Sequence, residues 1–245
     1  MFSMNTTRTI VGIIGNFASL FLRISPLPTI VQIWKKKSVE QYSAAPYLAS
    51  FLNCGIWAFY GIPIVHPNSL LFWTVNGSGV VSAIVYLFVF LYCSDRKKRF
   101  KVALIVLAEV VFMAAHAILV LTLAHNWKLR SVIIGTVAGL SSILMYASPL
   151  AIMKLVITTK SVEYMPFSIS LCSFVAGLCW TVYALLPIEP YILSSSSIGA
   201  LAGLAQLVLY AKYYKSNKSV DENFKVDMEM GMTEIDVANK PKSEA

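Results

Sequence analysis

The tetrapeptide Lys37-Ser38-Val39-Glu40 occurs a second time, letter for letter, as Lys160-Ser161-Val162-Glu163. The two copies lie 123 residues apart, and three further landmarks keep that offset over more than thirty residues. Four landmarks in one register indicate a duplicated unit, so the repeat decides the architecture. The three other pairs are Ser25-Pro26-Leu27 with Ser148-Pro149-Leu150, Trp57 with Trp180, and Tyr60 with Tyr183.

Composition indicates what each unit is made of. The chain is 57% hydrophobic and 13% charged, with a mean hydropathy of +0.69, whereas a soluble domain carries about 25% charged residues. Seven apolar runs recur, each close to the about 20 helical residues that cross a bilayer core about 30 Å thick. Because backbone groups in lipid must be paired internally, these runs are predicted to be helices. They cover approximately residues 9–33, 44–62, 69–93, 102–124, 131–157, 167–187 and 190–213.

The 123-residue offset matches the first three spans with the last three in sequence and leaves the fourth span without a counterpart, as a single linker. Since three is odd, a second copy joined directly would insert upside down, and one extra helix restores its orientation. The sequence therefore predicts an all-α integral membrane protein with two parallel three-helix repeats joined by a linker helix. The expected parts are the first repeat at 1–93, the linker helix with its loops at 94–127, the second repeat at 128–214, and a tail at 215–245 that is predicted to be disordered.

Charged loops predict the orientation. Thirteen Lys and Arg residues fall in the short loops and chain end of one side and three on the other. Because basic loops stay in the cytosol, we expect the N-terminus outside and the tail inside. The net charge of +8 then reflects topology rather than nucleic-acid binding, which would need a soluble basic domain. The plasma membrane is the expected location.

The sequence carries little enzyme chemistry. The four cysteines have no metal-ligand spacing, the three histidines form no pair four residues apart, and no Gly-rich phosphate loop is present. We therefore expect neither an enzyme nor a metal or other cofactor.

Prolines are placed where bent helices would be needed. Pro26 and Pro149 keep the 123-residue offset inside their spans, and proline bends a helix by removing a backbone hydrogen bond. For these two we favour a hinge. Pro46 and Pro166 open spans, where proline also serves simply as a helix start.

Polar and amphipathic residues also recur within the spans. Asn53 and Asn76 lie deep in the second and third spans, and a buried carboxamide needs a partner, either another helix or a ligand. Trp57 and Trp180 could present faces to a sugar ring or form an interfacial belt. Ser194 to Ser197 lie in the first half of the last span. The pattern alone leaves binding and structural roles open.

In combination these strings resemble the plant SWEET sugar transporters over about residues 9–214. The resemblance implies a facilitative, bidirectional carrier that works by alternating access, with a mono- or disaccharide substrate and a homotrimer in the lipid bilayer. In the first half it is carried by Ser25 to Thr29, Lys37 to Glu40, Pro46-Tyr47, Asn53-Cys54, Trp57, Tyr60-Gly61 and Thr74 to Gly79, and in the second by Met145 to Leu150, Lys160 to Glu163, Met165 to Phe167, Trp180 and Gln206 to Tyr210.

The resemblance also assigns roles to residues. The sugar would lie between Trp57 and Trp180 and bond Asn76. The four prolines at 26, 46, 149 and 166 would form a cytosolic hinge set, and the outer gate would contain Tyr60, Tyr183 and Glu189. Four pocket positions distinguish sucrose carriers, which have small residues there, from hexose carriers, and here they predict glucose-like hexoses. Those positions are Leu22, Asn53, Met145 and Ala176.

Two residues depart from the family pattern. Ser196 stands where the second sugar-binding Asn of a Pro-Asn-x-x-Gly motif is expected, and a serine hydroxyl is shorter with one donor instead of two. Arg23 stands inside the first span, where an apolar residue is usual; it could pair with Glu109 or reach the cytosolic headgroups. The alternatives to a sugar carrier are a carrier of another small neutral solute and a seven-span receptor, although a receptor would not show the duplication.

Overall fold

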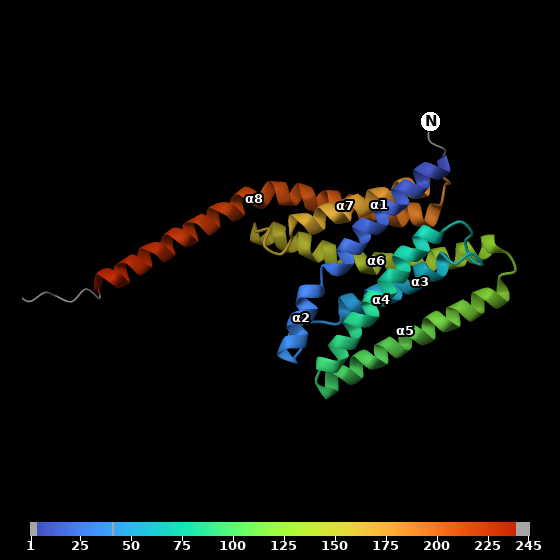
Figure 1. Ribbon diagram of the computed structural model, residues 1–245, viewed down its shortest axis with the longest axis horizontal. Coiled ribbons are helices and arrows are strands. Elements are labelled where there is room, and N and C mark those ends of the chain that lie inside the picture. The colour runs from blue at the N-terminus through green and yellow to red at the C-terminus, as the bar shows by residue number, and fades with distance from the viewer. Residues whose placement is uncertain (1–3, 41, 239–245) are drawn as a thin grey trace, which may run out of the picture.

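The computed structural model describes residues 4–40 and 42–238, and of residues 144, 147 and 215–238 the backbone alone. The described chain is helical, with no strand (Figure 1). Its helices are α1 (Met4–Ile24), α2 (Leu27–Lys36), α3 (Ala45–Tyr60), α4 (Leu70–Cys93), α5 (Arg96–Leu123), α6 (Trp127–Thr159), α7 (Phe167–Leu185) and α8 (Pro190–Ala238).

These helices correspond to the seven predicted spans. Six segments of the described chain are long and apolar enough to cross a membrane, and α1 and α2 together form the first of them, Met4–Lys36. The remaining span is α3, which has only 16 residues but many buried side chains. The predicted all-α membrane fold is therefore confirmed. The backbone of α8 is helical as far as Ala238, and residues 239–245 of the predicted tail lie outside the described residues. The disorder of the tail and the division of the chain into parts stay predictions.

The two repeat-matched prolines have different effects on their helices. At Pro26 the first span breaks, since α1 ends at Ile24 and α2 begins at Leu27, whereas Pro149 lies inside an uninterrupted α6. The first span carries a second proline, Pro28, in the first turn of α2. Pro26 and Pro28 together leave two backbone N–H groups missing within three residues. This explains why the first span breaks whereas α6 stays continuous at Pro149.

Both copies of the repeated tetrapeptide, residues 37–40 and 160–163, form a loop after the first span of their repeat, and the two loops share three features, although Glu40 has a positive φ of 44° and Glu163 does not. In each copy the lysine caps the helix in the left-handed conformation, with φ of 51° at Lys37 and 57° at Lys160. In each, the serine hydroxyl accepts the backbone N–H of the glutamate, at 3.2 and 3.3 Å, and the valine is buried. The tetrapeptide thus ends one span and anchors the turn toward the next.

Helix contacts follow a two-fold pattern that exchanges the repeats. Within the first repeat α4 packs on both α1 and α3, and within the second α8 packs on both α6 and α7. Between the repeats, α1 packs on α7 and α3 packs on α6. The linker helix α5 contacts α3, α4 and α6 and lies along one edge of the bundle (Figure 1). This arrangement is that of two parallel repeats facing each other.

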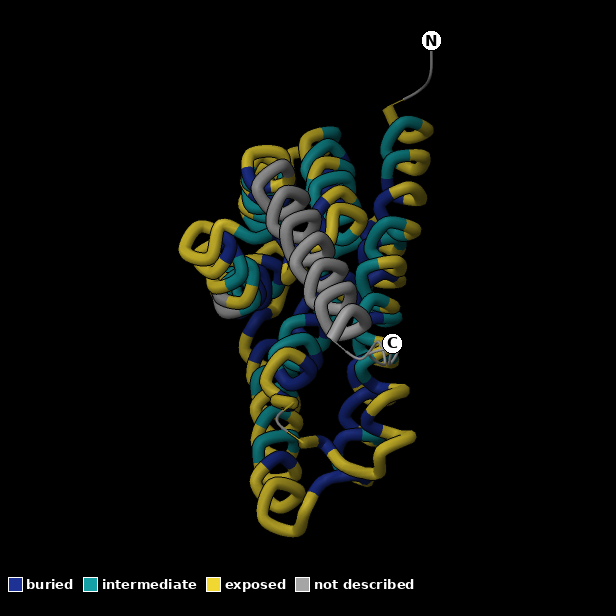
Figure 2. The backbone as a smooth tube through the Cα atoms, turned by 90° about the vertical axis from the view of Figure 1, so that its left-hand side faces the viewer, coloured by how far each residue is buried: buried dark blue, intermediate teal, exposed yellow. Residues whose placement is uncertain are grey.

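Burial distinguishes the interior of the bundle from its flanks. In Figure 2 buried residues gather where helices meet, and exposed residues follow their outer sides. Many exposed side chains are large and apolar, for example Phe17, Val81 and Phe88 at 70%, 62% and 64% exposure. Such surfaces suit contact with lipid tails. The largest cluster of buried residues joins both repeats and surrounds Trp57 and Trp180.

Candidate functional site

A cavity of about 250 Å³ lies between the repeats and is lined by side chains from α1, α3, α4, α6, α7 and α8. Seven of the eight predicted sugar-contacting residues line it, and the eighth, Leu22, lines an adjoining recess of about 340 Å³. The seven are Asn53, Trp57, Asn76, Met145, Ala176, Trp180 and Ser196. The fold therefore brings these positions together from distant parts of the chain.

The two tryptophans are held by reciprocal hydrogen bonds across the repeat interface. Trp57 Nε1 donates to Ser142 Oγ of α6 at 2.9 Å, and Trp180 Nε1 donates to Ser19 Oγ of α1 at 3.2 Å. Ser19 and Ser142 are themselves 123 residues apart. Both tryptophans are nearly buried, at 4% and 7% exposure, so they are not part of an interfacial belt. Each repeat thus orients the tryptophan of the other.

Phe72 of α4 connects the two indoles. Its ring makes an edge contact with Trp57 and another with Trp180, both at a centroid distance of 5.2 Å. Phe72 also lines the cavity. In the third helix of each repeat the offset is 120 residues, as between Asn76 and Ser196, so the counterpart of Phe72 is Ile192. Neither the duplication nor a polar group therefore marked Phe72 in the sequence.

Asn76 and Ser196 occupy matching places in the third helix of each repeat. Asn76 Nδ2 donates to the Phe72 backbone oxygen at 2.9 Å, and its Oδ1 makes no hydrogen bond to a residue that the structure describes. Ser196 Oγ donates to the Ile192 backbone oxygen at 2.7 Å and accepts from Thr181 Oγ1 at 3.3 Å. The Ser196 hydroxyl therefore uses more of its hydrogen-bonding capacity within the protein than the Asn76 carboxamide does.

The carboxamide of Asn53 faces α6. Its Oδ1 accepts from Ser141 and Ser142, at 3.2 and 3.3 Å, which links it to the serine that holds Trp57. The interhelical hydrogen bond expected for a buried Asn is present here, and Asn53 also lines the cavity.

One end of the bundle, the predicted outer end, is closed by charged and aromatic side chains. Arg8 forms an ion pair with the Glu189 carboxylate and lies over the Tyr183 ring at 4.2 Å. His66 Nε2 is 3.5 Å from Glu189 Oε1, and its ring stacks on Tyr60 with centroids 4.8 Å apart. The three predicted gate residues thus meet, while Arg8 and His66 were missed from the sequence. We call these five residues the outer cluster.

Ser131 of α6, which lies 123 residues after Arg8, also reaches the outer cluster, because its Oγ is 3.0 Å from His66 Nδ1. A recess of about 730 Å³ shares Arg8 and Tyr183 with the cluster but no lining residue with the central cavity. The cluster separates the two spaces.

Toward the other, predicted inner end the cavity meets the recess that contains Leu22. Pro26 and Pro46 line this recess together, and Ser19, Arg23 and Met145 line both spaces. Pro46 lies in the first turn of α3 and Pro166 caps α7, as the sequence indicated for helix starts. Pro149 and Pro166 line neither space, so a set of four hinge prolines stays a prediction.

The charged residues inside the spans do not pair with each other. Arg23 forms no ion pair with Glu109 or any other described carboxylate, and Nη1 instead donates to Cys54 Sγ at 3.2 Å. Glu109 and His116 belong to α5 and line neither the cavity nor the inner recess. The described residues contain no cluster of side chains that could hold a metal ion.

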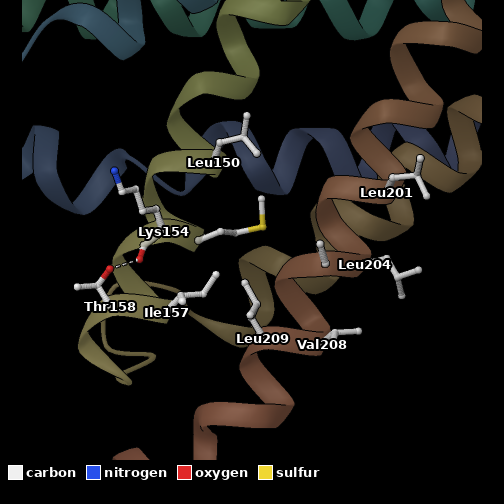
Figure 3. Close-up of a pocket in the computed structure, with 10 residues that line it drawn as sticks. Leu150, Lys154, Ile157, Thr158, Leu201, Leu204, Val208 and Leu209 are labelled. Atoms are coloured by element: carbon white, nitrogen blue, oxygen red, sulfur yellow. Dashed lines mark hydrogen bonds between the residues drawn. The ribbon is translucent and has the colours of Figure 1, made fainter.

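A further pocket lies outside the central cavity, between α6 and α8. Its lining is mostly aliphatic, and in Figure 3 the labelled side chains of the two helices border an open space. The Thr158 hydroxyl donates to the Lys154 backbone oxygen and so offers little to a ligand. Because Leu150, Leu201 and Val208 are 58 to 65% exposed, this pocket belongs to the lipid-facing surface rather than to a site for a polar solute.

Comparisons with known proteins agree with this geometry. The sequence matches the family described as "Sugar efflux transporter for intercellular exchange" twice, over residues 9–98 and 132–218, which is one match for each repeat. It is 50% identical over 218 residues to the bidirectional sugar transporter SWEET7 of Arabidopsis thaliana, covering 89% of this chain and 84% of that protein. It is also 50% identical to SWEET4 of Oryza sativa subsp. indica, over 91% of this chain and 86% of that protein.

A solved structure is similar as well. The structure of a eukaryotic SWEET transporter superposes with a TM-score of 0.84 at 37% sequence identity, covering 86% of this chain and 99% of that one.

Proposed function

This chain belongs to the SWEET family of sugar transporters, and from that premise we propose that it carries hexoses such as glucose in both directions by alternating access. Family membership makes it a transporter rather than an enzyme. The relatives are named as bidirectional sugar transporters, which supports a carrier that works without a fixed direction.

The observation that carries the proposal is a cavity between two matched repeats. One of its ends is closed, and side chains alone close it. The outer cluster blocks the path on one side, and the recess at Pro26 and Pro46 continues it on the other. Because the repeats contact each other through equivalent helices, a small rotation of one against the other would exchange which end is closed.

Three features support a hexose. The cavity, at about 250 Å³, is smaller than the about 300–1,000 Å³ of typical ligand pockets, which favours one sugar ring over two. Trp57 and Trp180, which we call the tryptophan layer, line the cavity with apolar rings. Asn76 offers a free carboxamide oxygen. Asn53 and Met145 occupy space in the same cavity that a disaccharide would need.

The setting in the cell is proposed on the sequence alone. The basic loops support an N-terminus outside and a C-terminus in the cytosol, and we propose the plasma membrane as the location. A homotrimer is proposed from the family resemblance.

The test is counterflow of radiolabelled glucose in proteoliposomes that contain the purified protein. Asn76→Ala should reduce exchange strongly, while Asn5→Ala, at an exposed position at the start of α1, should leave it unchanged. Unlabelled glucose should compete well and sucrose poorly. If sucrose competes as well as glucose, the hexose preference is wrong, and if folded protein exchanges no sugar, the proposed function itself fails.

A further inference from the structure

Arg23 is the one charged residue among those that line the central cavity and the inner recess. It lines both spaces, so a solute that moves from the tryptophan layer to the inner end passes its guanidinium. It lies one helical turn from Ser19, which accepts the Trp180 N–H. Four residues of helix rise by about 6 Å, so the charge is next to the tryptophan layer on the inner side.

The guanidinium is poorly satisfied by the protein. An arginine has five N–H donors, but the one side-chain bond that the described residues give it runs from Nη1 to Cys54 Sγ, a weak acceptor. Its Nε is buried without a hydrogen-bond partner. None of the described carboxylates lies within ion-pair distance of the guanidinium.

The second repeat shows that this place in the fold does not require a cation. The residue 123 positions after Arg23 is Tyr146, whose hydroxyl donates to the Ser195 backbone oxygen at 2.6 Å. Each of the two side chains lies against a glycine of the third helix in its own repeat, Arg23 at Gly79 and Tyr146 at Gly199. A phenol fills this position and is satisfied within the protein, whereas the guanidinium keeps unused donors beside the cavity.

We propose that Arg23 selects sugars that carry a single carboxylate, such as hexuronates, as substrates of this carrier. The ring occupies the tryptophan layer and the carboxylate forms a two-pronged hydrogen-bonded pair with the guanidinium. This inference rests on the proposed transport function and deepens it. An unpaired charge in a half-buried site is unfavourable, and an anionic substrate removes that penalty while it is bound.

The charge count favours a carboxylate over a phosphate. The linings of the cavity and the recess supply one positive charge and no second one. A hexuronate brings one negative charge, and the pair is neutral. A phosphate ester carries about −1.5 to −2 at neutral pH, so the bound complex would keep a net negative charge in a confined space.

The experiment compares radiolabelled glucuronate and glucose in counterflow with proteoliposomes of the full chain. Arg23→Gln removes the charge, Arg23→Tyr installs the residue of the second repeat, and Arg23→Lys keeps the charge without the planar fork. We expect glucuronate exchange by the unmodified protein, a loss of at least about tenfold in Arg23→Gln and Arg23→Tyr, and a smaller loss in Arg23→Lys. Melting temperatures of the purified variants close to that of the unmodified protein show that all three are folded.

A second readout uses the charge of the substrate. An imposed inside-positive membrane potential should raise the internal glucuronate concentration above the external one and leave the two glucose concentrations equal. If the unmodified protein exchanges glucose but not glucuronate, the inference is wrong and the proposed function stands. If chloride instead accelerates glucose exchange in an Arg23-dependent way without glucuronate transport, Arg23 holds an inorganic ion and the inference is equally overturned. If neither sugar is exchanged, the proposed function fails first.

Discussion

Ser196 reaches the cavity from the same place in α8 as Asn76 does in α4, yet its hydroxyl already bonds within the protein. Replacing it by asparagine should give the sugar a second carboxamide opposite Asn76. One added hydrogen bond contributes about 0.5–1.5 kcal/mol, so Ser196→Asn should tighten glucose binding by about two- to tenfold. Isothermal titration of the detergent-purified protein with glucose measures this change.

The matched control is Ser194→Asn, which makes the same substitution in the same serine run. Ser194 is exposed, does not line the cavity, and donates to the Tyr191 backbone oxygen. Its variant should bind glucose as the unmodified protein does. Unchanged or weaker binding in Ser196→Asn would remove the idea that this serine limits affinity.

At the same scale, the sequence identified some residues of the site and missed others for a physical reason. Tryptophan and asparagine in an apolar span are rare enough to be noticed, and the structure places those singled out around the cavity. Serine is common in such spans, so Ser19 and Ser142 gave no signal by residue type. Their 123-residue offset would have marked them.

At the scale of helices, the break between α1 and α2 offers the clearest mechanical prediction. Pro26→Ala restores a backbone donor at the break and lets the first span approach a continuous helix. We expect glucose exchange to slow several-fold with little change in affinity, because Pro26 lines the inner recess but not the central cavity. Initial counterflow rates over a range of glucose concentrations separate the two effects.

Pro28→Ala should slow glucose exchange as well, because the break depends on both missing N–H groups. If Pro26→Ala exchanges glucose at the normal rate, the break is a static feature of the fold and not a hinge.

The elements themselves were largely predictable, because hydrophobic run length and repeat register are strong signals in a membrane protein. The repeated tetrapeptide predicted equivalent loops, and the left-handed lysines at 37 and 160 show why the same four residues serve both. The unequal effects of Pro26 and Pro149 could not be obtained from their shared register. They depend on Pro28, which has no counterpart two residues after Pro149.

At the scale of the whole molecule, closure of one end depends on a small number of contacts between the repeats. Arg8 comes from α1 of the first repeat, and Glu189 precedes α8 of the second. Tyr60, His66 and Tyr183 pack around this pair, and the rest of the outer end has no other ion pair among the described residues. The balance between conformations that are closed and open at this end should therefore respond to the Glu189 charge.

Glu189→Gln leaves the largely buried Arg8 without its counter-charge, and removal of one partner from a buried ion pair costs about 3–5 kcal/mol. Only the closed conformation bears that cost, so the population should shift toward conformations open to the outside.

A cysteine at Val75, a cavity-lining position, reports this shift in a variant whose native cysteines are replaced by serine. Labelling from outside intact cells with a membrane-impermeant maleimide should become at least about tenfold faster. Glu163→Gln, in a loop that we propose to be cytosolic, should leave the labelling rate unchanged. Equal labelling rates in both variants would mean that other contacts between the repeats, and not this ion pair, hold the outer end closed.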